Sequence, residues 1–357
     1  MTGRTVIFRH RRMAVAMLAA IALAPACVEV EAQRVEGSFQ RTLTVSSTPE
    51  VEVVTGSGRI EVQAGPAGRI EITGRIRGHD GWGWNRRGPV SLEERVRQIE
   101  ANPPIEQTGN VVRIGRLTDK DLGQGVSISY TVTVPASSSL RAKTGSGSQL
   151  IDGVEGSVDA SSGSGSLTLR DIGGRSRAST GSGSITADTV DGAFQASSGS
   201  GSIRATRVAG AITAKTSSGS IDVEQTRAGD VTVSSGSGSV RLRGVRGAVQ
   251  ASTSSGGLTI DGELSDGWRL SSSSGSVNIG LARSQGFELD ATTSSGRIEV
   301  DFPVTVTGTV GRRSLRGSAQ GGGPLLRVRT SSGGISIQKR EQAGRLTEDA
   351  SALENAR

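Results

Sequence analysis

A short marker of the form Ser/Thr-Gly-Ser-Gly, or a close variant of it, recurs about every 18 residues along much of this sequence. Successive copies are separated by 18, 18, 18, 18, 19, 18, 19 and 21 residues; a further copy follows after 37, and an earlier one ends at Gly58. So short a fixed period is typical of a protein in which one small unit stacks on copies of itself. Many serines and glycines are therefore expected to be architectural. The glycines that end the regular copies are Gly147, Gly165, Gly183, Gly201, Gly219, Gly238, Gly256, Gly275 and Gly296, and the late copy ends at Gly333.

The residues that follow each marker alternate between apolar and polar. The second and fourth residues after the marker glycine are apolar in nearly every copy and a polar residue stands between them, as in Ile203-Arg204-Ala205. Alternation with a period of two predicts a half-buried strand. Gln149 stands in the first apolar column of its copy, so we expect that coil to lie at a boundary of the stack.

A second, shorter strand is predicted in each unit. An apolar column precedes a glycine turn, at which we expect glycine to supply a positive φ, and a column of alanines follows it. Two strands and two turns in 18 residues describe one coil of a β-solenoid, whose neighbouring coils pair in parallel about 4.8 Å apart. The fold class predicted is all-β, a parallel β-solenoid similar to a β-helix with two-strand coils of about 18 residues. The two columns are Val154, Ile172, Val190, Val208 and Val245, and Ala160, Ala178, Ala196, Ala214 and Ala251.

The fifth residue after the marker is charged in several copies, and a parallel stack would place these residues one above another. We expect a solvated ladder of weak ion pairs, each contributing less than about 1 kcal/mol. A carboxylate row that binds a metal ion or a glycan is the alternative, which the interposed arginines disfavour. The column reads Asp152, Arg170, Asp188, Thr206, Glu224, Arg243 and Asp261.

Composition agrees with a thin, stacked fold. Hydrophobic residues make up 34% of the 357 residues and aromatic residues only 3%, while 52 residues are glycine. Low complexity of this kind also occurs in disordered chains. The regular aliphatic columns argue against disorder for residues 141–340.

Residues 1–32 are predicted to be an export signal. Four arginines precede a short apolar stretch at 13–24, which is too short for a comfortable transmembrane helix. Cleavage at 26/27 would expose Cys27, the only cysteine, for lipid attachment, whereas cleavage at 32/33 would give a simple secreted protein. No other long apolar segment occurs, so we expect no transmembrane span, and we expect the protein in the periplasm, the outer envelope or on the cell surface.

Much of the formal charge belongs to this signal. Removal of residues 1–26 takes away four arginines and no acid, which lowers the net charge from +7 to +3, and removal of residues 1–32 leaves +5. The remaining charges of both signs are interspersed, so no nucleic-acid partner is expected.

Residues 33–140 are predicted to form a β-rich N-terminal region with one short helix. Ser91 is a plausible N-cap, with Glu94 completing a capping box, and Leu92, Val96 and Ile99 make an apolar stripe. The helix is expected to pack beside the start of the stack or to cap it. Residues 341–357 are expected to be a polar, flexible tail.

The motifs of the N-terminal region and of the repeats follow one another in a characteristic order. GSGRIEV at 56–62 is followed by the charged helix at 92–100, GNVVRI at 109–114, YTVTVP at 130–135 and then the SGSI repeats from Leu140. This arrangement, over roughly residues 36–340, resembles the bacterial DUF4097 family of adhesin-like, β-strand-repeat envelope proteins. The resemblance implies an exported repeat protein and supplies no catalytic residues.

Few side chains in the sequence are suited to catalysis. His79 is the only histidine after the signal, and clustered cysteines and histidines of the kind that bind zinc do not occur. We therefore expect no catalytic residue, no metal and no cofactor. The enzyme alternative is polysaccharide cleavage by two carboxylates of the charged column. That alternative lacks aromatic residues for sugar stacking, because the ladder has only Phe194, Trp268 and Phe287.

The best interaction candidate is a glycine-rich loop that carries Trp82, Trp84, Arg86 and Arg87. Tryptophan beside arginine could grip a glycan, a peptide or an anionic surface, although the tryptophans could instead pack on the helix. A second candidate, the arginine-rich segment 311–324, interrupts the period and is expected to loop out.

Three functions remain open from the sequence. The first is a non-enzymatic adhesin or envelope scaffold that displays a solenoid surface rich in Ser, Thr, Gly and Arg to an envelope glycan or protein. The second is a periplasmic accessory protein that binds one envelope partner through the tryptophan loop. The third is a polysaccharide-active β-helix enzyme.

Overall fold

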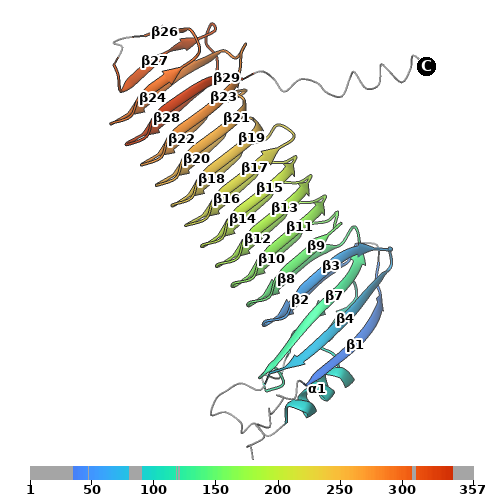
Figure 1. Ribbon diagram of the computed structural model, residues 1–357. Coiled ribbons are helices and arrows are strands. Elements are labelled where there is room, and N and C mark those ends of the chain that lie inside the picture. The colour runs from blue at the N-terminus through green and yellow to red at the C-terminus, as the bar shows by residue number, and fades with distance from the viewer. Residues whose placement is uncertain are drawn as a thin grey trace, which may run out of the picture. The chain divides into compact units, whose positions relative to one another are not determined.

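The computed structural model describes residues 35–46, 48–79, 91–117, 119, 121–307 and 311–340. Within these residues the chain forms two β-sheets, of 14 and 15 strands, and one α-helix (Figure 1). We call them sheet A, whose strands follow the markers, and sheet B, whose strands precede them. The predicted all-β solenoid is confirmed, because most neighbouring strands within each sheet are parallel.

Each coil consists of one strand of sheet B, a marker turn and one strand of sheet A. The sheet B members are β2 (Glu50–Thr55), β8 (Ser139–Thr144), β10 (Val158–Ser162), β12 (Ser176–Thr180), β14 (Phe194–Ser198), β16 (Ile212–Thr216), β18 (Val231–Ser235), β20 (Val249–Thr253), β22 (Trp268–Ser272), β24 (Phe287–Thr293) and β28 (Leu325–Thr330). Their sheet A partners are β3 (Ile60–Gly65), β9 (Gln149–Asp152), β11 (Leu167–Ile172), β13 (Ile185–Val190), β15 (Ile203–Val208), β17 (Ile221–Gln225), β19 (Val240–Arg246), β21 (Leu258–Glu263), β23 (Val277–Ala282), β25 (Ile298–Val300) and β29 (Ile335–Arg340).

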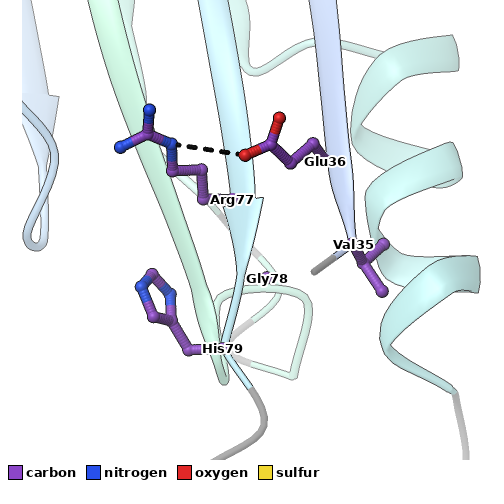
Figure 2. A pocket seen from close by; sticks show the side chains of 5 residues that line it. All are labelled: Val35, Glu36, Arg77, Gly78 and His79. Carbon is purple, nitrogen blue, oxygen red and sulfur yellow. Dashed lines mark ion pairs between the residues drawn. The ribbon is translucent and has the colours of Figure 1, made fainter. Parts of the chain in front are cut away.

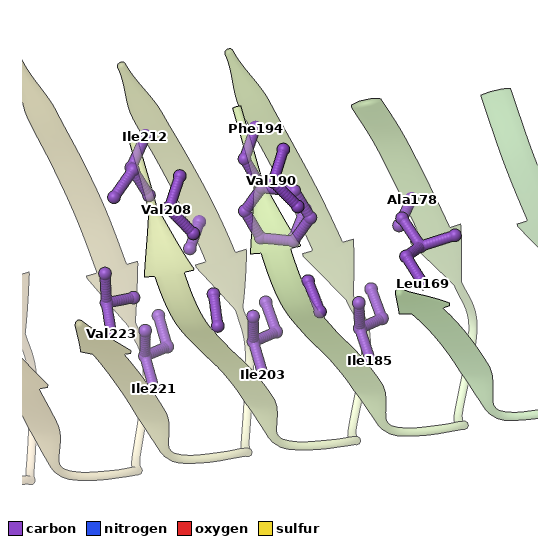
Figure 3. Packing of buried hydrophobic residues seen from close by; sticks show 14 of the residues in the cluster. Leu169, Ala178, Ile185, Val190, Phe194, Ile203, Val208, Ile212, Ile221 and Val223 are labelled. Atoms are coloured by element: carbon purple, nitrogen blue, oxygen red, sulfur yellow. The ribbon is translucent and has the colours of Figure 1, made fainter. Parts of the chain in front are cut away.

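The register of neighbouring strands confirms the repeat. Leu167 pairs with Ile185 and Ile185 with Ile203, each one period apart, so every column of the sequence becomes a row of stacked side chains. The apolar columns lie buried between the two sheets (Figure 3). The alanine column also stacks, as in the pairs of Ala178 with Ala160 and Ala196.

A column of buried hydroxyls accompanies the apolar core. The Ser or Thr three residues before each marker glycine is buried, and its hydroxyl accepts a hydrogen bond from the N–H of that glycine. The same hydroxyl donates to the marker glycine carbonyl of the adjacent coil, as Ser198 does to Gly183 at 2.9 Å. Only the first coil differs, since Thr55 donates to the carbonyl of Ile128. The members of this hydroxyl column are Thr55, Thr144, Ser162, Thr180, Ser198, Thr216, Ser235, Thr253, Ser272, Thr293 and Thr330.

The marker glycines are required by close approach of the backbone. A Cβ placed on Gly201 would lie 1.8 Å from the carbonyl oxygen of Gly183. The expectation that glycine serves mainly to supply a positive φ is wrong for most repeats, because neither the marker glycines nor Gly156, Gly174, Gly192 and Gly210 adopt one. A positive φ occurs instead at the corner after the first half of the sheet A strand, where Asp171, Thr189 and Arg207 have φ between 49° and 58°.

The stack begins earlier in the chain than residue 141. β2 and β3 form a coil around Gly58 and pair in parallel with β8 and β9. The expectation that the Gln149 coil lies at a boundary is therefore wrong, because β9 has a parallel neighbour on each side. Gln149 is tolerated in the interior because its side-chain amide donates to the carbonyl of Ser161 at 2.6 Å.

Antiparallel strands complete the N-terminal end. In sheet A, β3 is followed by β7 (Val126–Pro135), β4 (Arg69–Gly78) and β1 (Glu36–Thr44). In sheet B, β6 (Val111–Ile114) pairs in parallel with β2, and β5 (Ile105–Thr108) forms the edge.

Helix α1 (Leu92–Ala101) covers the inner side of this end. Ser91 is its N-cap and accepts from the N–H of Glu94, and Val96 and Ile99 are buried, as the sequence predicts. Beside the helix lie Gly37 of β1, next to Val96, and Gly78 of β4. The helix contacts β1 and β4, so it occupies the layer that sheet B fills elsewhere.

The C-terminal coils do not follow the order of the sequence. The coil β28–β29 lies between β22–β23 and β24–β25, although it comes last in the chain. The segment that links β25 to β28 carries β26 (Val304–Val306) and β27 (Ser314–Ala319), which add antiparallel strands to the end of sheet B. The expectation that residues 311–324 loop out is therefore wrong, because Ser314–Ala319 pairs with β24 and β26.

Candidate functional site

The tryptophan loop predicted from the sequence lies outside the described residues. This applies to Trp82, Trp84, Arg86 and Arg87, and equally to Cys27 and the export signal. The described residues nearest to this segment are His79, directly after β4, and Ser91, the N-cap of α1.

The charged column of the ladder is occupied by ion pairs, but these are not the vertical pairs expected. Arg170 lies in register with Asp152 and Asp188. Asp188 nevertheless pairs with Arg207 of the next coil, which is not in the charged column and has a positive φ. Asp261 pairs with Arg340 at 2.8 Å. Burial raises the pKa of Asp261 more than the nearby arginines Arg340, Arg243 and Arg241 lower it. No cluster of three or more metal-ligating side chains occurs in the described ranges.

A basic outer surface lies instead at the N-terminal end of sheet A, where β4 alternates regularly. Ile70, Ile72 and Ile76 point into the core, so Arg75 and Arg77 point outward and are exposed. Helix α1 packs on the opposite side of β1 and β4. No other described element covers the side that carries Arg75 and Arg77, and both side chains are exposed. Figure 2 shows Arg77 and His79 on one side of the strands and Val35 on the side of the helix.

The neighbouring strands bring hydroxyls and a third arginine beside these two. Arg75 is in register with Ser129 of β7, and Arg77 with Ser127. The backbone N–H of Arg59, which follows the first marker, donates to the Ser129 hydroxyl oxygen at 3.2 Å. Side chains from three separate parts of the sequence therefore meet on one face. We call Arg59, Arg75, Arg77, His79, Ser127 and Ser129 the basic face.

Three adjoining depressions mark the basic face, with volumes of about 310, 370 and 380 Å³. The first lies between Glu36, Arg77 and His79 (Figure 2), and the second between Arg59, Glu61 and Arg75. The third, which we call the marker depression, is lined by Ser57, Arg59, Arg77, His79, Ser127, Ser129, Gly147 and Ser148. The described residues of its lining supply two guanidinium groups, an imidazole and hydroxyls, and none of them is a carboxylate.

The arginines of the basic face are weakly engaged. Arg77 lies 3.7 Å from Glu36, and both side chains are more than 60% exposed, so this ion pair is worth at most about 1 kcal/mol. Among the residues that the structure describes, Arg59 and Arg75 have no ion-pair partner. Elsewhere carboxylates do hold arginines firmly: the Glu52 carboxylate receives two 2.8 Å contacts from Arg116 and raises the pKa of that guanidinium.

The serines of the repeat divide into two classes. Those of the hydroxyl column are buried and make two hydrogen bonds each. The serines immediately before and after the marker glycine, such as Ser164 and Ser166, are mostly exposed, and within the described residues the one hydroxyl among them that makes a hydrogen bond is that of Ser295, which donates to the carbonyl of Ser331 at 3.2 Å. Two tracks of serine hydroxyls therefore run along the marker turns, one before and one after the marker glycines, and they begin at Ser57 and Ser148, which both line the marker depression.

Sequence reasoning missed the basic face because its members are far apart in the chain. One signal was present: between residues 69 and 77 isoleucines alternate with polar residues, which predicts that Arg75 and Arg77 share an outward face. The proximity of Arg59 could not be read from the sequence, because it depends on the parallel pairing of β3 with β7 across 70 residues.

The described residues contain no helix long and apolar enough to cross a membrane.

Comparison with known proteins gives a family and distant structural likenesses. The family model described as Toastrack DUF4097 matches residues 131–338, more than half of the chain. No curated protein matches the sequence.

Crystal structures of low similarity cover most of the chain. A provisionally described lipid binding protein from Parabacteroides distasonis is 11% identical, with a TM-score of 0.37, and the match covers 85% of this chain and 97% of that one. A provisionally described adhesin from Bacteroides fragilis is 12% identical, with a TM-score of 0.34 and the same coverages. A provisionally described cell adhesion protein from Clostridium sporogenes is 10% identical, with a TM-score of 0.17, over 85% of this chain and 100% of that one.

Proposed function

This chain belongs to the Toastrack DUF4097 family, and from that premise we propose that it is an exported, non-enzymatic β-repeat protein that serves as an adhesin or scaffold of the cell envelope. It would act by presenting its repeated surface to binding partners. A stacked ladder presents the same polar surface many times over, so that many weak contacts add up.

The observation that carries this proposal is the division of the repeat serines. The buried hydroxyls join the coils, whereas in the described chain the exposed serines at the marker turns, apart from Ser295, make no side-chain hydrogen bond. Repeated free hydroxyls beside a basic face suit recognition of polar polymers at an envelope.

Two features support a binding role over polysaccharide cleavage. The ladder aromatics Phe194, Trp268 and Phe287 are buried, so they offer no sugar-stacking surface. The charged-column carboxylates Asp188 and Asp261 are held by Arg207 and Arg340. A test is incubation with envelope polysaccharides, in which new reducing or unsaturated ends would overturn the non-enzymatic role.

Export is proposed from the sequence of residues 1–32 and is tested by protease shaving of intact cells, with released peptides identified by mass spectrometry. Release of solenoid peptides such as 185–203 from unlysed cells supports display at the surface. Protection until the outer envelope is opened would contradict an adhesin role and leave a periplasmic scaffold. Recovery of the full chain, with residues 1–26 attached, from the cytoplasm alone would overturn export.

A further inference from the structure

The marker depression combines charge and hydroxyls from three separate parts of the described chain. It is formed by the end of β4, by β7 and by the first two marker turns, so its walls come from paired strands. Within the part of the chain that the structure describes, its charged lining groups are Arg59 and Arg77, with His79 beside them. Among the described residues, the carboxylates Glu36 and Glu61 line the two adjoining depressions instead.

We propose that the marker depression binds the oxyanion group, a carboxylate or a phosphate, of an acidic glycan. This inference rests on the proposed display function, because it assigns a ligand class to the surface that the ladder presents. Arg59 and Arg77 would supply the charge, and the hydroxyls of Ser57, Ser127 and Ser129 would supply neutral hydrogen bonds.

The state of these groups favours an anion as the ligand. Arg59 is exposed and has no carboxylate partner in the described structure, while Arg77 has only its long, exposed contact with Glu36, which a ligand anion could replace at small cost. A guanidinium presents several donors to an oxyanion in one plane. The Ser129 oxygen already accepts the backbone N–H of Arg59, so its own O–H remains free to donate toward the depression.

The surroundings favour a glycan over the other polymers that carry anions. A nucleic acid needs a row of cations along its backbone and aromatic side chains for its bases. Here serines continue from the depression along the marker turns, and all the aromatic side chains within the described ranges are buried. A membrane surface would call for exposed apolar side chains, and the one large exposed hydrophobic in those ranges is Leu325, at the opposite end of the ladder. A glycan carries hydroxyls that match the serine tracks and scattered charges that match a single basic depression.

The test is calorimetric titration of the purified full chain with defined probes. The acidic probes are a tetramer of galacturonic acid, which offers carboxylates, and a glucose tetramer bearing a phosphate, which offers the alternative oxyanion. The unmodified glucose tetramer is the neutral probe. Vesicles that contain phosphatidylglycerol and a single-stranded DNA oligomer represent the two competing polymer classes.

Two double variants separate the site from net charge. Arg59→Gln with Arg77→Gln alters the depression, whereas Arg204→Gln with Arg241→Gln removes two exposed arginines from the outer side of sheet A elsewhere on the ladder. Neither Arg204 nor Arg241 has an ion-pair partner in the described structure. Both double variants lose the same charge from exposed positions, so neither is expected to unfold.

We expect at least one acidic tetramer to bind the native chain at least 10-fold more tightly than the neutral tetramer. The Arg59/Arg77 variant should lose at least 10-fold of that affinity and the Arg204/Arg241 variant less than 2-fold. Equal losses in both variants, or no saturable binding of either acidic tetramer, would overturn the proposal. It would also be overturned if only the vesicles or the DNA bound in a manner that depends on Arg59 and Arg77. Because the assay uses purified protein, its failure is distinct from a failure of export or surface display.

Discussion

The hydroxyl oxygen of Thr180 lies 2.9 Å from the carbonyl oxygen of Gly165 in the adjacent coil. The same hydroxyl accepts from the N–H of Gly183 at 3.2 Å, so it joins two coils while it closes its own turn. Both glycine groups are buried, and neither could reach water if the hydroxyl were removed. The contact therefore explains why Ser or Thr recurs at this position in all the coils.

Replacement of Thr180 by valine keeps the shape of the side chain and removes its hydrogen bonds. We expect Thr180→Val to lower the free energy of unfolding by about 2–6 kcal/mol, since each of the two buried groups left unpaired costs about 1–3 kcal/mol. The measurement is urea unfolding followed by circular dichroism. Thr180→Ser is the control, because Ser162 and Ser198 fill the same column, and it should lose less than about 1.5 kcal/mol. Equal losses in the two variants would contradict a hydrogen-bonding role.

A methyl group on a marker glycine should disrupt the stack. The Cβ of Gly201→Ala would meet the backbone carbonyl of Gly183 at 1.8 Å, so two coils would have to separate. We expect a loss of about 3 kcal/mol or more, above the usual range of overpacking because rigid backbone is displaced. Gly257→Ser is the matched control, because its Cβ would meet nothing closer than 3.4 Å and Ser239 and Ser276 stand in the same column. Limited proteolysis and thermal unfolding of both variants provide the comparison, and a normal melting temperature for Gly201→Ala would refute the close-approach argument.

Backbone strain at the sheet A corner should be removable. Thr189 has φ of 58°, a left-handed conformation that is unfavourable for a β-branched residue and is better tolerated by asparagine. We expect Thr189→Asn to raise the free energy of unfolding by about 0.5–1 kcal/mol, after allowance for the lost exposed hydrogen bond from Arg207. Thr186→Asn, on the exposed side of the same strand but with ordinary strand geometry, should give no gain. A gain in both variants would indicate a cause other than strain.

The ion pair of Asp261 with Arg340 should respond to pH through its carboxylate. The folded-state pKa of Asp261 is raised above its ordinary value by desolvation, so the folded protein holds this proton more tightly than the unfolded chain. Stability from this group is therefore fully present below the unfolded pKa, near 4, and is lost as the pH rises through the folded value. Asp261→Asn removes that dependence.

We accordingly expect Asp261→Asn to melt at a higher temperature than the native protein at neutral pH, with the difference shrinking as the pH falls toward 4. Melting temperatures of both proteins between pH 3.5 and 7.5 check this. If the difference in melting temperature is constant over this range, or grows as the pH falls, Arg340 lowers the pKa of Asp261 at least as much as desolvation raises it.

Regular stretches of the chain were predictable because their side chains obey one rule in every coil. The alternation around Ile203 and Ile221 predicts sheet A, and the column of Ala178 and Ala196 predicts the buried rows of sheet B; both are confirmed. The buried serine of each marker and its exposed neighbours look alike in sequence, however. Only the buried hydroxyl lies close enough to donate to the marker glycine carbonyl of the adjacent coil, and that distance depends on how the coils stack.

The ends were less predictable because pairing there depends on long-range register. The 37-residue interval before Gly333 fits either a coil beyond Gly296 or a coil beside Gly275, and the structure places it between the two. The marker at Gly58 was visible as a copy, but its coil partner lies 89 residues later at Gly147. Long-range pairing also hid the proximity of Arg59 to Arg75 and Arg77, because it depends on β7, which pairs with both β3 and β4.

The out-of-sequence coil at the C-terminal end also limits how a ladder like this can lengthen. Since β28–β29 is inserted between β22–β23 and β24–β25, a tandem duplication there would have to place its new coil inside an interlocked group. A duplication of one 18-residue period between residues 158 and 263 meets no such obstacle, because each coil there contacts only the coil before and the coil after it in the sequence. Gene-level growth of this protein is therefore confined to its middle, where each added period would move the two ends apart by about 4.8 Å and leave both of them intact.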